Sequence, residues 1–219
     1  MAPPSLVIAT HNLGKIRELA TLLADLGLTL KTLADYPGCP EVVEDGDTFA
    51  ANATKKALAV ARYTGLPALA DDSGLEVDAL GGRPGVHSAR YAAERTAPKR
   101  PTDADNSKKL LAELAGVPLA QRTARFVCAM VVAFPNGRTV LAQGTLEGLI
   151  QTAPRGQSGF GYDPVFWLPE YEATVAEVGL AVKNRISHRA KALTQLKTTL
   201  ADLLRQEPEL FQPVHPHGT

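Results

Sequence analysis

The start of the chain alternates between strand-like and helical patterns, and this order constrains the fold more than any other feature. Residues 5–10 form a short apolar run, 16–26 carry apolar residues at spacings of three and four, and 28–33 return to a strand-like pattern. A strand, a helix and a second strand in this order predict a parallel pair joined by a right-handed crossover. The chain is therefore expected to contain a parallel sheet covered by helices.

The rest of the chain extends this α/β pattern. Apolar periodicity, bounded by glycine, proline or capping residues, predicts helices over 48–64, 106–115 and 183–206 and strands over 67–70, 125–134 and 139–150. The last two strands are joined by a Pro-Asn-Gly turn, which is typical of a hairpin. A hairpin adds antiparallel strands, so the sequence predicts a mixed sheet.

Composition excludes several classes of partner. The 23 basic residues balance 23 acidic ones, so no global positive field attracts a nucleic-acid polymer or an anionic membrane. The longest apolar run, Val127 to Phe134, is too short to span a membrane, and the first residues lack the pattern of a signal peptide. Cys39 and Cys128 are too few for a disulfide framework. A cytoplasmic location is expected.

The turn between the first strand and the first helix is a candidate phosphate site. The first backbone N–H groups of a helix are unpaired and carry partial positive charge, so they attract anions. A glycine there allows close approach, and a lysine adds a mobile cation. The alternative is an ordinary capped turn with a solvated lysine. The turn consists of Thr10, His11, Asn12, Leu13, Gly14 and Lys15.

Acidic residues gather after the strand at 67–70 and before the helix at 48–64. Asp71 and Asp72 follow the strand at the sheet edge where α/β proteins bind ligands, and their side chains are expected to point to opposite faces. Mg²⁺ prefers one or two carboxylates with phosphate oxygens, so Glu44 could complete a site with Asp72. The alternatives are an Asp-rich turn and a solvated acidic loop.

Two further segments suit a planar base. The loop containing Phe160, Gly161, Tyr162 and Asp163 sets aromatic rings among glycines. His188 and Arg189 lie near the start of the last helix, where their polar groups could reach a pocket. The alternatives are a plain turn and a solvated His-Arg pair.

Five motifs occur in a fixed order: T-H-N-x-G-K at 10–15, A-D-D-S-G-L at 70–75, G-G-x-P-G-x-x-S-A-R-Y at 81–91, G-F-G-Y-D-P at 159–164 and S-H-R at 187–189. Together they closely resemble the inosine/xanthosine triphosphate pyrophosphatase family, enzymes that remove deaminated purine nucleotides. The resemblance runs from about residue 6 to about residue 204.

The resemblance implies hydrolysis of ITP, dITP and XTP to the monophosphate and pyrophosphate, with Mg²⁺, by a homodimer. It also implies an elongated mixed sheet flanked by helices, with two lobes around a central substrate cleft. We therefore expect one α/β domain over 1–210 and a disordered tail over 211–219, where His215 and His217 form no metal site.

Residue roles carried over from the resemblance divide into four groups. The triphosphate is held by residues 10–15 with Lys56 and Lys183, the metal by Glu44 and Asp72, and the base by residues 160–163 with His188 and Arg189, while Ser73 lines the substrate. Asp72 is also the proposed acceptor of the proton from the attacking water. One departure is Ala51, where many bacterial relatives carry glutamate, so the number of metal-ordering acids is left open.

Base selection follows from the chemistry at C6. Hypoxanthine and xanthine present an acceptor oxygen there, whereas adenine presents an amino donor. Donors from His188 or Arg189 would pair with the oxygen and be left unpaired by adenine. The residues that reject guanine are not identified. The alternative functions are a pyrophosphatase for modified pyrimidine or methylated purine triphosphates, and a nucleotide sensor without activity.

Overall fold

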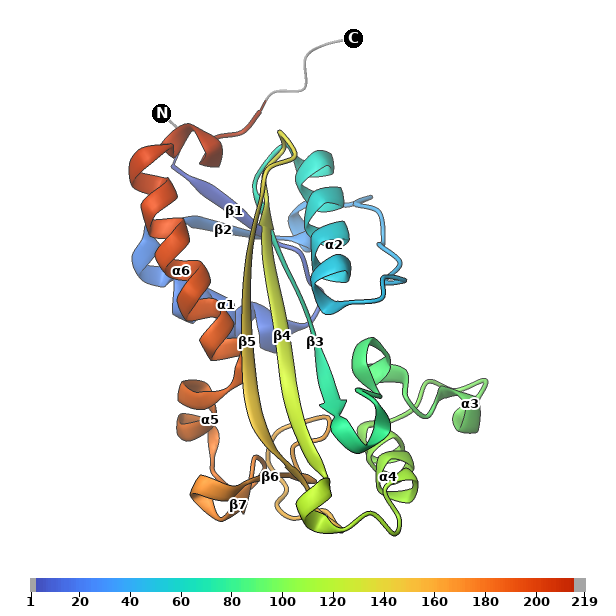
Figure 1. Cartoon of the computed structure of the whole chain (residues 1–219). Helices are drawn as coiled ribbons and strands as arrows, with labels where there is room; N and C mark the ends of the chain where they lie inside the picture. The colour runs from blue at the N-terminus through green and yellow to red at the C-terminus, as the bar shows by residue number, and fades with distance from the viewer. Residues whose placement is uncertain (1–2, 215–219) are drawn as a thin grey trace. The chain divides into compact units, whose positions relative to one another are not determined.

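The computed structural model describes residues 3–214 and contains one mixed β-sheet (Figure 1). Its strands, in chain order, are β1 (Ser5–Ile8), β2 (Thr29–Thr32), β3 (Ala68–Val77), β4 (Thr123–Ala133), β5 (Thr139–Ile150), β6 (Phe166–Leu168) and β7 (Ala173–Thr174). The order across the sheet is β2-β1-β3-β4-β5-β6-β7. β1 runs parallel to β2 and β3, and β6 runs antiparallel to β5 and β7. The predicted α/β class with a mixed sheet is therefore confirmed.

Six α-helices accompany the strands in the described part of the chain: α1 (Leu13–Leu23), α2 (Phe49–Thr64), α3 (Ala93–Thr96), α4 (Asp103–Glu113), α5 (Leu180–Ile186) and α6 (His188–Gln206). Side chains cap the first two helices: Asn12 accepts from two backbone N–H groups of α1, and Thr48 accepts from one of α2. α1 and α2 therefore begin close to where the sequence predicts.

The chain divides into two compact units. The first takes the described residues of Met1–Asp72, Ala129–Gln143 and Ala192–Thr219, and the second takes Ser73–Cys128 and Gly144–Lys191. Buried aliphatic and aromatic side chains fill the core of each unit, for example Leu19, Leu69 and Phe134 in the first and Leu110 and Phe166 in the second. Each unit thus has a hydrophobic interior of its own.

Two boundaries differ from the sequence prediction. The strand expected to stop at Asp71 continues as β3 to Val77, so the reading of Asp-Asp-Ser-Gly as a turn is wrong. The helix expected over 183–206 is two helices, because Ser187 has extended backbone angles and its Oγ accepts from the N–H of Ala190. His188 and Arg189 therefore lie in the first turn of a separate helix.

The chain remains packed past the predicted domain end at residue 210. Phe211 is fully buried and stands edge-on to Phe134, with ring centroids 5.5 Å apart. The N–H of Val214 donates to the C=O of Gly65 at 2.9 Å. Residues 215–219 of the expected tail, with both of its histidines, lie outside the described residues.

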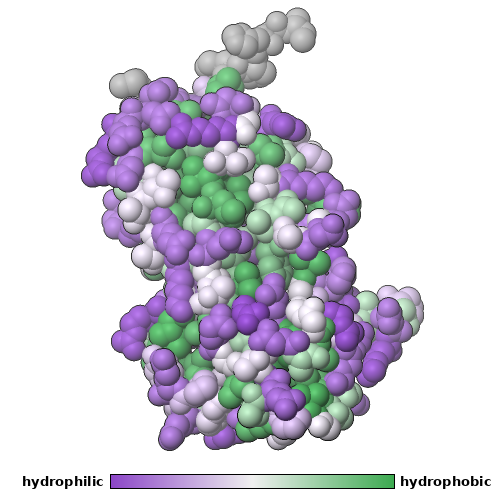
Figure 2. Space-filling view, viewed as in Figure 1, coloured by the Kyte–Doolittle hydropathy of each residue, from purple (hydrophilic) through white to green (hydrophobic). Residues whose placement is uncertain are grey.

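The surface mixes polar and apolar residues on the face drawn in Figure 2. Within residues 3–214 we find no helix long and apolar enough to cross a membrane. Both cysteines, Cys39 and Cys128, are free thiols, as predicted.

Candidate active site

Asp71 and Asp72 lie side by side in β3 and have different partners. Lys15, in the first turn of α1, places its Nζ 2.7 Å from Oδ2 of Asp71, whose side chain is only 3% exposed. A buried carboxylate needs such a cation because burial otherwise destabilises its charge. The pair ties the predicted phosphate turn to β3, and it leaves Asp72 as the more accessible acid.

Asp72 is held by a residue that the sequence prediction missed. Asn52 of α2 donates from Nδ2 to Oδ2 of Asp72 at 2.9 Å, and its Oδ1 accepts from the N–H of Gly46 at 2.7 Å. Asn52 is 1% exposed. The available signal was a polar residue on the buried face of an alanine-rich helix, next to Phe49 and Ala53.

Glu44 and Lys56 face each other beside the phosphate turn. Lys56 Nζ donates to Oε1 of Glu44, and both side chains are half-buried. They line a cavity of about 220 Å³ with residues that include Thr10, His11 and Cys39. The cavity thus brings together predicted residues from the turn, the acidic loop and α2.

The rest of the acidic loop is surface. Asp45 is exposed and pairs with Lys55 at 2.6 Å. The hydrogen bond and the charge of Lys55 lower the pKa of Asp45. The Asp45 carboxylate is therefore engaged with Lys55, while Glu41 and Glu44 of the same loop line the cavity.

The phosphate turn is partly capped by its own side chain. Oδ1 of Asn12 accepts from the N–H groups of Gly14 and Lys15, at 2.9 and 3.2 Å. The N–H of Asn12 itself donates to Thr10 Oγ1 at 3.2 Å. Leu13 and His11 are exposed at this turn. An anion here would therefore meet the Leu13 N–H and mobile side chains rather than a full set of open amides.

A second pocket, of about 130 Å³, lies within the second unit. All six residues predicted to hold the base line it: Phe160, Gly161, Tyr162, Asp163, His188 and Arg189. Ser73, predicted to line the substrate, and Lys183, predicted to hold the triphosphate, line the same pocket. Ser88, Asn106 and Phe126 complete its polar and aromatic walls. The sequence prediction did not include these three.

The glycine loop of this pocket is fixed by Asp163. Its Oδ2 accepts from the N–H of Phe160 at 3.0 Å and from Lys183 Nζ. The Cβ of any larger residue at position 159 would lie 2.1 Å from the same oxygen, and Gly159 has a φ of +85°. Phe160 is 58% exposed, with Lys183 Nζ 4.4 Å from its ring centre. The loop therefore presents an open aromatic face beside a cation.

Tyr162 contributes differently from Phe160. Its ring is buried, and its hydroxyl donates to the C=O of Ser88 at 2.9 Å. Burial raises the pKa of Tyr162, so it remains a neutral donor. Its role in the pocket is to support the wall at Ser88.

His188 and Arg189 are buried in the first turn of α6, so the reading of this pair as solvated surface is wrong. Their side chains are 8% and 5% exposed. The His188 ring stacks on Phe126 with centroids 5.0 Å apart, and Phe126 stacks on Phe166 at 4.4 Å. Arg189 Nη2 lies 3.5 Å from Ser73 Oγ. Two nitrogen-rich side chains are thus aimed at one pocket.

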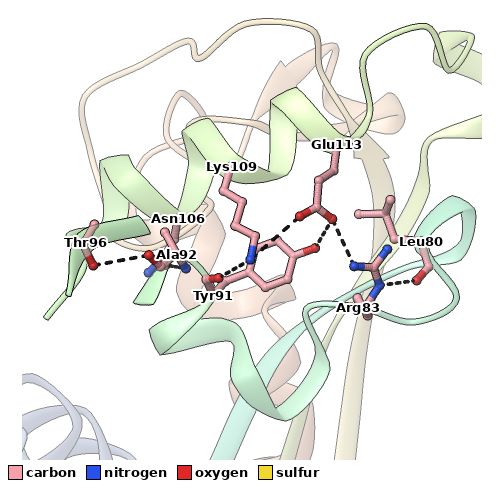
Figure 3. A network of polar contacts seen from close by, with 8 residues as sticks. All are labelled: Leu80, Arg83, Tyr91, Ala92, Thr96, Asn106, Lys109 and Glu113. Atoms are coloured by element: carbon pink, nitrogen blue, oxygen red, sulfur yellow. Dashed lines mark hydrogen bonds and ion pairs between the residues drawn. The ribbon is translucent and has the colours of Figure 1, made fainter. Parts of the chain in front are cut away.

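Figure 3 shows a polar network that includes Asn106, one of the residues that line this pocket. Asn106 Oδ1 accepts from the N–H of Ala92 at 2.8 Å. The neighbouring Tyr91 donates its hydroxyl to Glu113 at 2.5 Å, and its C=O accepts from Lys109 at 2.8 Å. Burial and the adjacent Glu113 carboxylate raise the pKa of Tyr91 to about 12. A neutral tyrosine therefore holds α4 to the segment that precedes it.

Comparison with known proteins decides the family. A model described as the Ham1 family matches residues 6–199. The chain belongs to the Ham1 family.

Curated relatives and solved structures of this Ham1 family member agree with that assignment. A dITP/XTP pyrophosphatase of Geobacillus kaustophilus is 58% identical, over 87% of this chain and 91% of the relative. One of Desulforamulus reducens is 56% identical, over 86% and 91%. The structure of a HAM1 protein from Coxiella burnetii matches with a TM-score of 0.84 and 41% identity, over 90% of this chain and 98% of that one. The resemblance stated from the motifs is confirmed.

The donor set of this Ham1 family chain fits a metal ion that arrives with a nucleotide. Among residues 3–214, no cluster of three or more His, Cys, Asp or Glu side chains could hold a metal. Mg²⁺ needs only one or two protein carboxylates when phosphate oxygens and water complete its shell. The two predicted ligands, Glu44 and Asp72, would be enough for such an ion.

Proposed function

We propose that this chain hydrolyses ITP, dITP and XTP to the nucleoside monophosphate and pyrophosphate, and so removes deaminated purines from the nucleotide pool. The observation that carries the proposal is that two consecutive residues of β3, Asp72 and Ser73, contact different groups of polar side chains. Asp72 accepts from Asn52 of α2, the helix whose Lys56 contacts Glu44, and the preceding Asp71 pairs with Lys15. The next residue, Ser73, lines the pocket with Arg189. A triphosphate requires the first kind of site and a purine base the second.

Attack on the α-phosphorus requires an aligned water, an acceptor for its proton and compensation of negative charge. Asp72 is the proposed acceptor, because it is half-buried and its Oδ2 is already oriented by Asn52. Lys15 and Lys56 are the proposed partners of the leaving pyrophosphate. Each lysine is paired with a carboxylate in the structure, so the phosphates would compete with Asp71 and Glu44 for it.

Mg²⁺ is the proposed cofactor, held by Glu44 and Asp72. When bound, it would polarise the phosphate oxygens and neutralise part of their charge. In the structure Glu44 contacts Lys56. An ion at Glu44 would weaken that contact and leave the Lys56 ammonium available to the phosphates.

The base is proposed to stack on Phe160 and to accept hydrogen bonds at its C6 oxygen from His188 or Arg189. Phe160 presents an open ring, and the two basic side chains are buried, so a lost hydrogen bond there is costly. Adenine brings a donor to the same place, and its amino group would leave the protein donors unpaired.

A homodimer and a cytoplasmic location are also proposed, from the family resemblance. Size-exclusion chromatography with light scattering tests the first, since a dimer has twice the 23.2 kDa chain mass. Fractionation of the native cells tests the second.

The proposal is tested by incubating the purified chain with Mg²⁺ and a panel of nucleotides, then separating the products. ITP, dITP and XTP should yield monophosphate and pyrophosphate, while ATP and GTP react much more slowly. Preference for dUTP or dTTP would favour a pyrophosphatase for other modified nucleotides. Tight binding of ITP without turnover would make the chain a nucleotide sensor.

A further inference from the structure

Asn52 makes two hydrogen bonds that join separate parts of the candidate phosphate site. Its Nδ2 donates to Asp72 Oδ2 in β3, and its Oδ1 accepts from the N–H of Gly46 in the loop that carries Glu44. The two partners fix the orientation of the amide, because a carboxylate can only accept and a backbone N–H can only donate. With 1% exposure, water does not replace either contact.

The approach of the loop to α2 is close enough to require glycine. A Cβ at Gly46 would lie 2.8 Å from Asn52 Oδ1 and 3.0 Å from the Cβ of Ala51. Four residues along α2, Lys56 contacts Glu44 of the same loop. Residues spaced by four lie on one face of a helix, so α2 holds the acidic loop at two points.

We propose that Asn52 is a positioning residue, which sets the Asp72 carboxylate and the Glu44 loop in the arrangement that catalysis and metal binding need. This inference rests on the proposed function. The Asn52 amide holds one oxygen of the Asp72 carboxylate, Oδ2, and so fixes the orientation of that carboxylate. An aspartate at position 52 would keep the Gly46 contact but face Asp72 with a second negative charge.

The test compares kcat and KM for ITP, the affinity for Mn²⁺ alone, and thermal unfolding in three variants. Asn52→Asp should lower kcat by about 10- to 100-fold, the range seen when residues that orient metal ligands are lost, with KM changed by less than about threefold. Asn52→Ala should weaken Mn²⁺ binding by about tenfold, measured by electron paramagnetic resonance without nucleotide. Asn136→Asp, in the exposed hairpin turn, is the matched control and should match the original chain.

A reciprocal variant separates positioning from stability. The variant that combines Asn52→Asp with Asp72→Asn again sets an amide against a carboxylate. Its melting temperature should therefore be close to that of the original chain, whereas Asn52→Asp alone should melt at a lower temperature. Turnover should not return, because the carboxylate now stands on α2 instead of β3.

Normal kcat and normal Mn²⁺ affinity in both Asn52 variants would overturn the inference, and so would a rise in KM alone. If Asn52→Asp does not fold, Asn52→Ala carries the same test, and normal kcat and normal Mn²⁺ affinity in that variant overturn the inference. Failure of the proposed function has a different signature: the original chain would not hydrolyse ITP, or Asp72→Asn would remain fully active.

Discussion

The Lys15 ammonium lies 2.7 Å from Oδ2 of Asp71, and the Asp71 side chain is 3% exposed. The same arrangement recurs where Lys56 meets Glu44 and Lys183 meets Asp163. Each lysine assigned to the triphosphate is thus held by a carboxylate before any substrate is present. Such pairing restricts a flexible side chain, so less conformational entropy is lost when phosphate binds.

Asp71→Asn is expected to impair both stability and substrate binding. The variant leaves Lys15 without its buried counter-charge, which should lower the free energy of unfolding by about 1–3 kcal/mol and raise KM for ITP. Denaturant unfolding and steady-state kinetics measure the two effects. Lys197→Ala breaks the exposed pair with Asp25 and should leave both quantities unchanged. Unaltered stability and KM in Asp71→Asn would contradict this role.

Phe160→Ala should weaken nucleotide binding without affecting the fold. Stacking of a base on an aromatic ring contributes about 1–3 kcal/mol, so KM for ITP should rise about tenfold or more while kcat changes less. The melting temperature should hold, because the ring is 58% exposed. Leu141→Ala, at another exposed apolar residue, is the control. A change in kcat alone would argue against stacking.

Arg189→Lys should reduce discrimination between ITP and ATP. Lysine keeps the charge but loses the planar set of donors, so kcat/KM for ITP should fall by about 10- to 100-fold with little change for ATP. The ratio of the two kcat/KM values is the readout. Arg138→Lys, in a surface pair with Glu207, controls for the substitution itself. An equal loss for both nucleotides would mean that Arg189 does not read the base.

Tyr91 should make stability fall at alkaline pH. Its pKa is raised to about 12 in the folded chain, from about 10 when unfolded, so between these values the unfolded state loses the proton first. Between about pH 10 and 12, the free energy of unfolding should fall more steeply in the original chain than in Tyr91→Phe. The difference between the two slopes should be about 1.4 kcal/mol per pH unit. Denaturant unfolding between pH 8 and 12 measures the difference, with Tyr171→Phe as an exposed control. Parallel pH curves for the original chain and Tyr91→Phe would exclude the effect.

Asp72→Asn should abolish turnover while the fold survives. Loss of a general base lowers rates by about 10²- to 10⁴-fold, and the substituted amide can still pair with Asn52. Single-turnover kinetics and circular dichroism provide the readouts. A folded variant with normal rates would remove Asp72 from the mechanism.

Much of the fold follows from local sequence signals. The first two helices, which begin after Asn12 and Thr48, and the hairpin near Asn136 depend on neighbouring residues, so the sequence predicts them well. The break at Ser187 was missed because apolar periodicity continues through it, and only its backbone angles and the cap to Ala190 end α5. The extension of β3 was missed because Asp-Asp-Ser-Gly is ordinary turn chemistry, whereas here Asp71 is buried against Lys15.

The candidate site, like the fold, was predicted from the sequence only in part. Ser73, His188 and Arg189 belong to the sequence motifs, and the structure brings these three side chains to one pocket. Asn52 and Phe126 act through contacts with residues 20 and 62 positions away, which no local pattern reveals. Their roles emerge only once α2 is packed near β3 and α6 begins at the base pocket.

The most direct test of the account is the product of ITP hydrolysis in the presence of Mg²⁺. Anion-exchange chromatography of a timed reaction should show IMP and pyrophosphate appearing together, with ATP turned over far more slowly. Release of IDP and orthophosphate as the primary products, or equal rates with ATP and ITP, would contradict it.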